Sequence, residues 1–227
     1  MFRAAAPIIA VACALVLAGC GEDDEPAERA ATPEPAPGPA AAAGCEAVEA
    51  PEPKGEQNLP KPTAKLERGT EYVATVTTNC GDFEITLDPR RAPRTGGSFK
   101  ALADEGFFDD TTFHRIAAGF VIQGGDPLGT GSGGPGYSIV EAPPPDIKYE
   151  NGVVAMAKTA TEEPGTSGSQ FFVVTAEDAQ LPADYALLGR VTAGMEVVDK
   201  IAAVETDPST EQPLEPVVMS SVAVAEQ

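Results

Sequence analysis

Alternating apolar and polar residues run through most of the chain after residue 71 and predict a mainly β domain. Residues 72–78 and 83–87 alternate in this way, and the turn-forming residues between them at 79–82 (NCGD) favour a hairpin. Further short runs typical of strands follow at 153–156, 171–174, 187–191 and 217–224. The chain therefore contains many short strands rather than a few long ones.

Two stretches carry apolar residues at helical spacing instead. Pro93 favours the start of a helix over about 94–104, and Gly106 favours its end. A second helix is predicted over 195–204, where apolar residues recur at helical intervals. Short strands with turn signals and two helices predict a closed antiparallel barrel capped by those helices.

The stretch 113–126 (FHRIAAGFVIQGGD) predicts two short strands joined by a turn of small residues. Strand alternation would place Phe113 and Arg115 on one face. In the next strand, it would place Phe120 and Ile122 on one face. A charged side chain would then lie beside aromatic rings.

Arg115, Phe120 and Gln123 are an unusual set for a protein core, but they suit the floor of a groove. They would supply a fixed cation, an apolar wall and an amide. The later stretch 168–174 (GSQFFVV) adds a second glutamine and two more rings. The alternative for Arg115 is a surface ion pair, which would contribute only about 0–1 kcal/mol to stability.

Residues 129–136 (GTGSGGPG) match the spacing G-x-G-x-x-G, which occurs in dinucleotide sites. The residues that follow do not begin a helix, and this context argues against nucleotide binding. We interpret the stretch as a flexible or tightly turned wall beside a groove, where glycines let a peptide backbone approach. His114 lies in no recognisable nucleophile or metal motif, and we expect it to be structural.

The two blocks 113–126 and 168–175 together resemble the signature blocks of the cyclophilin-type peptidyl-prolyl cis-trans isomerases, and the resemblance runs from about residue 72 to 224. It implies an eight-stranded barrel with one helix over each end, and catalysis of rotation about X–Pro bonds. It makes Arg115 the catalytic arginine and Gln123 the glutamine that supports it and the bound peptide. The substrate-binding positions that it implies are Phe120, Val121, Ala157, Lys158, Gln170, Phe172, Leu181 and Tyr185.

Several positions depart from the family pattern. Val121 stands where methionine is common, Lys158 where asparagine is frequent, and Tyr185 where histidine is frequent. Gln180 replaces an aromatic residue associated with cyclosporin binding, so the resemblance implies weak sensitivity to that drug. Gln180 and an unusually long loop at 159–166 leave an alternative open, namely a cyclophilin-fold peptide-binding module or holdase with little catalysis.

The first 65 residues differ in character from the rest. Residues 1–19 combine one arginine, an apolar run and small residues, which is typical of a signal peptide. The ending LAGC resembles the box of bacterial lipoproteins and implies lipid attachment at Cys20, with an ordinary secretory signal cut elsewhere as the alternative. Residues 20–65 are rich in alanine, proline and glutamate and predict a disordered linker, which leaves 66–227 as the folded domain.

These features predict an exported, membrane-anchored lipoprotein of the bacterial cell envelope. In such a setting Cys45 and Cys80 form an even pair, and we expect a disulfide between them, with two free thiols as the alternative.

The formal charge of −20 would repel nucleic acid, which we do not expect as a partner. The expected partners are proline-containing unfolded or extended polypeptides and, through the lipid anchor, the membrane. We expect a monomer and neither a metal nor another cofactor. A transport-type substrate-binding lipoprotein is suggested only by the anchor, and the lack of alternating β and α units argues against it.

Overall fold

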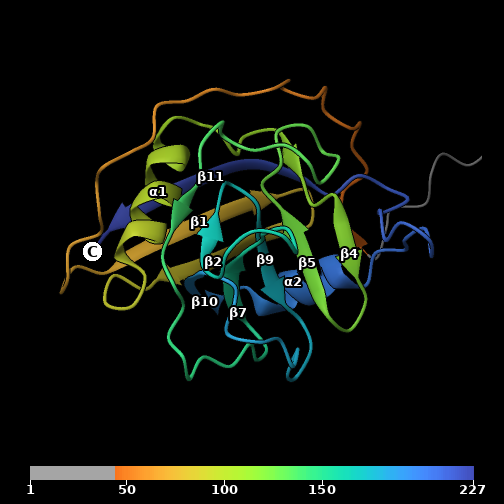
Figure 1. Cartoon of the computed structure of the whole chain (residues 1–227). Helices are drawn as coiled ribbons and strands as arrows, with labels where there is room; N and C mark the ends of the chain where they lie inside the picture. Colours follow the sequence, from red (N-terminus) through yellow and green to blue (C-terminus); the bar gives the residue numbers. More distant parts are fainter. Residues whose placement is uncertain (1–43) are drawn as a thin grey trace, which may run out of the picture. The chain divides into compact units, whose positions relative to one another are not determined.

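The structure is a computed structural model that describes residues 44–227. The predicted signal peptide (1–19), the predicted lipidation site Cys20 and residues 21–43 of the predicted linker lie outside the described residues. Within 44–227 the chain forms two helices and eleven strands (Figure 1). No helix in this range is long and apolar enough to cross a lipid bilayer.

Nine of these strands form one antiparallel sheet. They are β1 (Tyr72–Thr78), β2 (Gly81–Leu87), β3 (Thr111–Thr112), β4 (Arg115–Ala117), β5 (Val121–Gly124), β7 (Val153–Met156), β9 (Phe171–Val174), β10 (Leu187–Ala193) and β11 (Val218–Glu226). Their order across the sheet is β3-β11-β1-β2-β10-β7-β9-β5-β4. The remaining two, β6 (Ile139–Val140) and β8 (Thr166–Ser167), form a separate pair.

The two edges of the main sheet are neighbours in the sequence. β3 and β4 lie at opposite ends of the strand order, yet only Phe113 and His114 separate them along the chain. The sheet therefore curls until its edges approach each other, and one bridge joins Thr112 of β3 to Asp126, just after β5. The predicted mainly β fold with two helices is confirmed. The sheet has nine strands where eight were expected. The chain crosses from one edge of the sheet to the other at Phe113, so this stretch forms two short strands, β3 and β4, instead of one.

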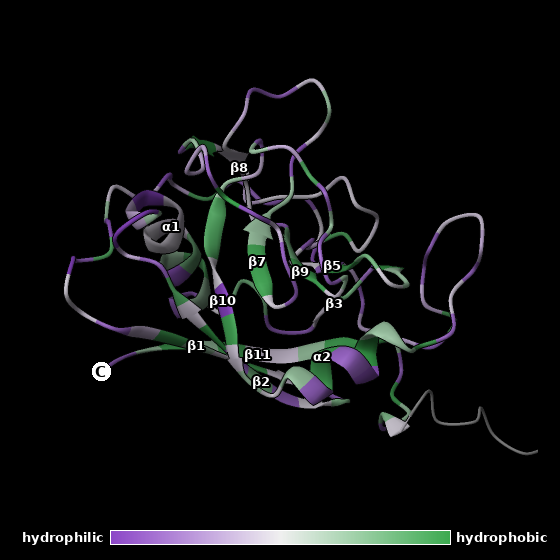
Figure 2. Ribbon diagram, turned by 90° about the horizontal axis from the view of Figure 1, so that it is seen from below, coloured by the Kyte–Doolittle hydropathy of each residue, from purple (hydrophilic) through white to green (hydrophobic). Residues whose placement is uncertain are grey.

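The two helices lie at separate ends of the curled sheet (Figure 1). α1 (Pro93–Asp104) buries Phe99 and Leu102 and packs against β10 and β11. α2 (Met195–Ala202) buries Val197, Val198 and Ile201 and packs against β2, β4 and β5. Its alternating green and purple bands in Figure 2 show the amphipathic pattern that predicted it. Both predicted helices are confirmed, although α2 ends at Ala202 rather than at residue 204.

Side-chain alternation along the central strands separates two apolar clusters on the two faces of the sheet. In β5, Ile122 belongs to the main core and Val121 to the second cluster. In β9, Val173 belongs to the main core and Phe172 to the second cluster. The main core joins the sheet to both helices, whereas the second cluster lies on the face that carries the candidate site.

The predicted faces of Phe113 and Phe120 are wrong. Phe113 is fully buried in the main core, whereas Arg115 is partly exposed on the other face. Phe120 packs against the second cluster, whereas Ile122 belongs to the main core. The reason is that β4 begins only at Arg115 and β5 only at Val121, so strand alternation does not extend back to either phenylalanine.

Residues 44–65 contain no strand or α-helix, but they follow the surface of the domain through specific contacts, which differs from the predicted disorder (Figure 1). Cys45 forms the expected disulfide with Cys80. Further along, the backbone N–H of Lys54 donates to the carbonyl oxygen of Pro127 at 2.9 Å. The composition of the segment did not reveal this, because its partners belong to the folded domain.

Candidate functional site

The candidate site is built on a row of residues that face one another across neighbouring strands. Arg115 in β4 is opposite Gln123 in β5, and Gln123 is opposite Phe172 in β9. Phe172 is in turn opposite Ala155 in β7. Directly opposed residues of antiparallel strands project from the same face of the sheet. A cation, an amide and an aromatic ring therefore lie in one row, in which the ring is Phe172 rather than the Phe120 that the sequence predicted beside Arg115 and Gln123.

The guanidinium of Arg115 is held on two sides. Its Nη1 donates a hydrogen bond to Oε1 of Gln123 at 3.3 Å, and its Nε donates to a carboxylate oxygen of Glu211 at 2.7 Å. The Arg115 side chain is 34 % exposed and that of Glu211 is 43 % exposed. Because the planar guanidinium is fixed by two partners, its remaining N–H groups point in a set direction.

Glu211 is a functional candidate that the sequence did not reveal. It lies 96 residues from Arg115 in a segment without helix or strand, between α2 and β11. Its backbone has a left-handed conformation with φ of 59°. Its carbonyl oxygen accepts a hydrogen bond from the N–H of Ile116 at 2.8 Å, and its N–H donates to Asp207 at 2.8 Å. The loop thus places the carboxylate directly beside β4.

A chain of amide hydrogen bonds continues from Gln123 to the glycine-rich loop. The Nε2 of Gln123 donates to Oε1 of Gln170 at 3.0 Å. The Nε2 of Gln170 donates to the carbonyl oxygens of Gly131 at 3.0 Å and Gly133 at 2.9 Å. The two glutamines singled out by the sequence are therefore adjacent, and they link Arg115 to the loop at 129–136.

Asp126 holds this glycine-rich loop in a tight turn. Its carboxylate is buried and accepts hydrogen bonds from the backbone N–H groups of Leu128, Thr130 and Gly131. A Cβ atom at Gly133 would lie only 2.0 Å from Oδ1 of Asp126. The loop is thus a tightly turned wall. Asp126 belongs to the block 113–126, but the sequence did not predict that its carboxylate holds this loop.

The predicted apolar positions gather in one patch on the face of the sheet that carries Arg115, which we call the apolar patch. Its residues all belong to or pack against the second cluster, and they are Phe120, Val121, Phe172, Leu181 and Tyr185. Val121 and Phe172 are buried, whereas the other three are half-buried and offer their surfaces to a ligand. The rings of Phe172 and Tyr185 meet edge to face, with 5.4 Å between centroids.

Tyr149 fixes the backbone of Tyr185. Its hydroxyl donates to the carbonyl oxygen of Tyr185 at 2.6 Å and accepts from the N–H of Tyr185 at 3.1 Å. Burial raises the pKa of Tyr149 to about 12, so the hydroxyl stays protonated at neutral pH. Tyr149 is a second residue that the sequence did not single out.

A groove of about 720 Å³ is lined by Gln123 and Gln170 but not by Arg115. We call it the glutamine groove, and Ala157, Lys158 and the glycine-rich loop also line it, as do Glu56 and Gln57. Nζ of Lys158 lies 5.7 Å from the centroid of the Tyr185 ring and donates to the carbonyl oxygens of Thr159 and Glu162. All eight predicted substrate-binding residues thus lie in the apolar patch or the glutamine groove.

Gln180 lies outside both surfaces. It is exposed, has a left-handed backbone with φ of 52°, and donates its N–H to a carboxylate oxygen of Asp178 at 2.8 Å. It lines a separate hollow of about 580 Å³ together with Asn151 and Arg190. The departure at this position therefore concerns a residue that lines neither surface.

His114 is buried, as expected of a structural residue, and neither of its ring nitrogens makes a well-formed hydrogen bond with any residue of 44–227. Burial lowers the pKa of His114 below its ordinary value, and the nearby charge of Asp126 opposes this only in part. The imidazole is thus neutral at pH 7. Within residues 44–227, no group of three or more His, Cys, Asp or Glu side chains could hold a metal ion.

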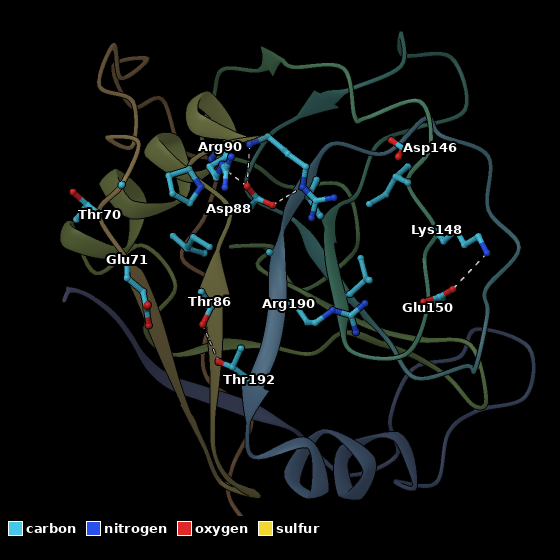
Figure 3. Close-up of a pocket in the computed structure, with 18 residues that line it drawn as sticks. Thr70, Glu71, Thr86, Asp88, Arg90, Asp146, Lys148, Glu150, Arg190 and Thr192 are labelled. Atoms are coloured by element: carbon cyan, nitrogen blue, oxygen red, sulfur yellow. Dashed lines mark hydrogen bonds and ion pairs between the residues drawn. The ribbon is translucent and has the colours of Figure 1, made fainter.

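A separate groove of about 660 Å³ shares no lining residue with the glutamine groove (Figure 3). Two ion pairs lie along its walls, between Arg91 and Asp88 and between Lys148 and Glu150. Thr86 and Thr192 are joined across β2 and β10 at 3.0 Å. This groove contains none of the residues predicted to act in catalysis.

The folded domain that contains the candidate site is similar to known proteins. Residues 73–224 match the family described as cyclophilin type peptidyl-prolyl cis-trans isomerase/CLD. The chain is 43% identical over 172 residues to peptidyl-prolyl cis-trans isomerase B of Streptomyces anulatus, an alignment that covers 68% of this chain and 97% of the relative. It is 36% identical over 170 residues to a probable peptidyl-prolyl cis-trans isomerase A of Mycobacterium leprae, covering 67% of this chain and 91% of the relative.

Solved structures of the same family also match this chain. A cyclophilin type peptidyl-prolyl cis-trans isomerase of Cryptosporidium parvum matches with a TM-score of 0.64 at 30% identity, covering 69% of this chain and 99% of that one. A structure of the same protein in the presence of the dipeptide Ala-Pro matches with a TM-score of 0.63 at 31% identity, covering 68% and 99%.

Proposed function

Because the chain belongs to the cyclophilin-type peptidyl-prolyl cis-trans isomerases, we propose that Arg115 is its catalytic residue and Gln123 a positioning residue. The chain is an isomerase that rotates X–Pro peptide bonds and so assists protein folding. Its substrates are proline-containing peptides, which agrees with the use of Ala-Pro in a related structure.

The proposed mechanism follows from the electronic structure of the prolyl amide. Resonance gives the bond partial double character and a rotation barrier of about 18–20 kcal/mol. In the twisted state, the prolyl nitrogen becomes pyramidal and regains its lone pair. A guanidinium N–H of Arg115 can donate a hydrogen bond to that lone pair, and this bond is stronger in the twisted state than in the planar one. Catalysis is then differential stabilisation of the transition state, without a nucleophile or a general base.

The observation that carries the proposal is the row Arg115, Gln123 and Phe172 across three strands. The apolar patch offers Phe120, Leu181 and Tyr185 to a prolyl ring, and the held guanidinium lies on the same face of the sheet. A substrate would place its proline on the patch and the chain N-terminal to that proline in the glutamine groove.

Replacing Arg115 tests the mechanism. We expect Arg115→Ala to lower kcat/KM for a proline peptide by about a hundredfold, comparable with the loss of one transition-state hydrogen-bond donor in other enzymes. Arg68→Ala removes an exposed arginine outside the site and should leave the rate unchanged. Arg115→Ala with the wild-type rate would refute the mechanism. Wild-type protein without isomerase activity that still binds proline peptides and suppresses aggregation would favour the binding-module alternative.

We also propose that the chain acts outside the cytoplasm on envelope proteins, held by lipid at Cys20. Support comes from the signal-like residues 1–19 and the LAGC ending. A further support is the disulfide between Cys45 and Cys80, since such bonds persist in oxidising compartments. Metabolic labelling with radioactive palmitate should mark the wild-type chain and not Cys20→Ser. Equal labelling of both would refute the anchor.

A further inference from the structure

The segment 54–59 lies directly against the glycine-rich loop and so borders the glutamine groove. The N–H of Leu59 donates to the carbonyl oxygen of Pro135 at 2.8 Å. A Cβ atom at Gly136 would lie 2.6 Å from the carbonyl oxygen of Gln57, so the two backbones are in contact. Glu56 and Gln57 line the groove together with Gln123 and Gln170. The segment thus supplies a wall of the groove.

This wall is fixed at several points along its length. Upstream, Cys45 is bonded to Cys80. Nζ of Lys54 donates to the carbonyl oxygens of Gly106 and Phe107, both at 3.0 Å. Downstream, Leu66 is buried, and its N–H donates to the carbonyl oxygen of Pro93 at 3.0 Å. The position of the wall is therefore determined by the folded domain, although the family match begins only at residue 73.

Three charged residues line the glutamine groove, namely Glu56, Lys158 and Glu162. The ammonium of Lys158 donates to two backbone carbonyl oxygens. The carboxylate of Glu162 accepts from the N–H of Thr159 at 2.6 Å and from its hydroxyl at 2.9 Å. The exposed carboxylate of Glu56 has no ion-pair or hydrogen-bond partner among residues 44–227. Lys158 and Glu162 thus use their charged groups in contacts within residues 158–162, whereas the carboxylate of Glu56 remains available to a ligand.

We propose that segment 54–59 is a substrate-selecting wall, and that Glu56 favours clients with lysine or arginine on the N-terminal side of the isomerised proline. The proposal rests on the proposed placement of the proline beside Arg115, since that placement directs the preceding residues into the glutamine groove. An extended peptide would then pass between the glycine-rich loop and Lys158, with a basic side chain reaching the wall at Glu56.

The test compares peptides that carry lysine, glutamine or glutamate two residues before the proline, with the full-length chain as enzyme. In the wild type, we expect kcat/KM for the lysine peptide to exceed that for the glutamate peptide. Glu56→Gln should reduce this ratio by about two- to fivefold, the effect expected of one exposed ion pair. High salt should reduce the wild-type ratio in the same direction. The rate for the uncharged glutamine peptide should change by a smaller factor than this ratio.

Glu52→Gln is the matched control, because Glu52 is an exposed carboxylate two residues before segment 54–59 that does not line the groove. An equal change of the ratio in Glu52→Gln and Glu56→Gln would overturn the proposal, since it would indicate the general field of an acidic chain. No change in Glu56→Gln would also overturn it. The glutamine peptide separates this result from a failure of the proposed mechanism, because its rate depends on Arg115 and only weakly on the charge of the wall.

Discussion

Glu211 offers a test, at the scale of single residues, of how much the orientation of Arg115 contributes to catalysis. Its carboxylate accepts a hydrogen bond from Nε of Arg115 at 2.7 Å and also neutralises part of the local charge. Because the pair is partly exposed, we expect Glu211→Ala to lower kcat by about three- to tenfold, with little effect on KM. Glu211→Gln should retain more activity, since an amide oxygen can still accept the hydrogen bond.

The control for this measurement is Glu205→Ala, which removes an exposed carboxylate from the same segment between α2 and β11. It should keep the wild-type kcat. If Glu205→Ala lost as much activity as Glu211→Ala, the effect would come from the loop or its charge and not from the contact with Arg115. Thermal unfolding of both variants separates a loss of folding from a loss of activity.

His114 gives a pH-dependent prediction at the same scale. Burial lowers the pKa of His114 in the folded chain below 6.5, its value in the unfolded chain. At a pH between the folded and the unfolded pKa, the unfolded chain therefore binds more protons than the folded one. The free energy of unfolding should therefore fall as pH decreases through 6.5, and this contribution should be fully present only above that pH. His114→Gln should flatten the dependence between pH 7.5 and 5, measured by denaturant unfolding at each pH.

The carboxylates whose pKa is lowered in the folded chain titrate below the range of pH 7.5 to 5, so they do not affect this measurement. Burial raises the pKa of Asp88, but hydrogen bonds from Arg91 and Arg90 outweigh it and hold the pKa below 3.8. Hydrogen bonds from Ser209 and Thr210 hold the pKa of Asp207 below 3.8 as well. An unchanged slope in His114→Gln would contradict the prediction and would assign the pH dependence to other groups.

The sequence predicted contacts between residues well where both residues belong to one continuous block. Arg115 and Gln123 lie in one such block, and their pairing follows from the hairpin between them. Glu211 was missed because it lies 96 residues away from Arg115 in a loop without periodicity. Tyr149 was missed because its role depends on the backbone of Tyr185, 36 residues further on. Contacts of this kind are set by the tertiary fold and leave no local pattern.

At the scale of elements, the glycine-rich loop is the part of the site whose shape can be changed without touching Arg115. A Cβ atom at Gly133 would overlap the carboxylate of Asp126, so Gly133→Ala must displace either the loop or the carboxylate. We expect a loss of about 1–3 kcal/mol in the free energy of unfolding. KM for proline peptides should rise because Gln170 bonds to the carbonyl oxygen of this glycine, whereas kcat should change little.

Gly134→Ala is a close control for the loop. No atom lies within 4 Å of a Cβ built at Gly134, and its φ is not in the left-handed region. This variant should keep both the stability and the KM of the wild type. If both alanine variants raised KM equally, flexibility of the loop rather than the contact with Asp126 would determine peptide binding.

The sequence predicted elements better than it predicted their connections. The bounds of β1, β7 and β9 agree with the predicted runs because alternation and turn residues mark them locally. The N-terminus of α1 was predicted from Pro93, but the carboxylate of Glu141 satisfies the N–H groups of Arg94 and Thr95 there. The split between β3 and β4 was not predicted, because it depends on where the two sheet edges meet.

At the scale of the whole molecule, residues 44–65 show what composition cannot predict. The segment has few apolar residues, which is why disorder was expected. Its backbone groups nevertheless pair with Pro127 and Pro135, and Lys54 bonds to Gly106 and Phe107. A rule that counts only the segment's own apolar residues omits partners that the folded domain supplies. The part of the chain upstream of the family domain thus becomes part of its surface.

The disulfide between Cys45 and Cys80 ties this segment to the β1–β2 turn, across a sequence separation of 35 residues. Closing a loop of this length reduces the entropy of the unfolded chain, and the double variant Cys45→Ser with Cys80→Ser should lose about 3–4 kcal/mol of unfolding free energy. Denaturant unfolding of this variant and of the wild type, each with and without reductant, measures the effect. Reductant should lower the midpoint of the wild type to that of the variant and leave the variant unchanged. Equal midpoints for the oxidised wild type and the variant would mean that the other contacts of residues 44–65 hold the segment without the covalent bond.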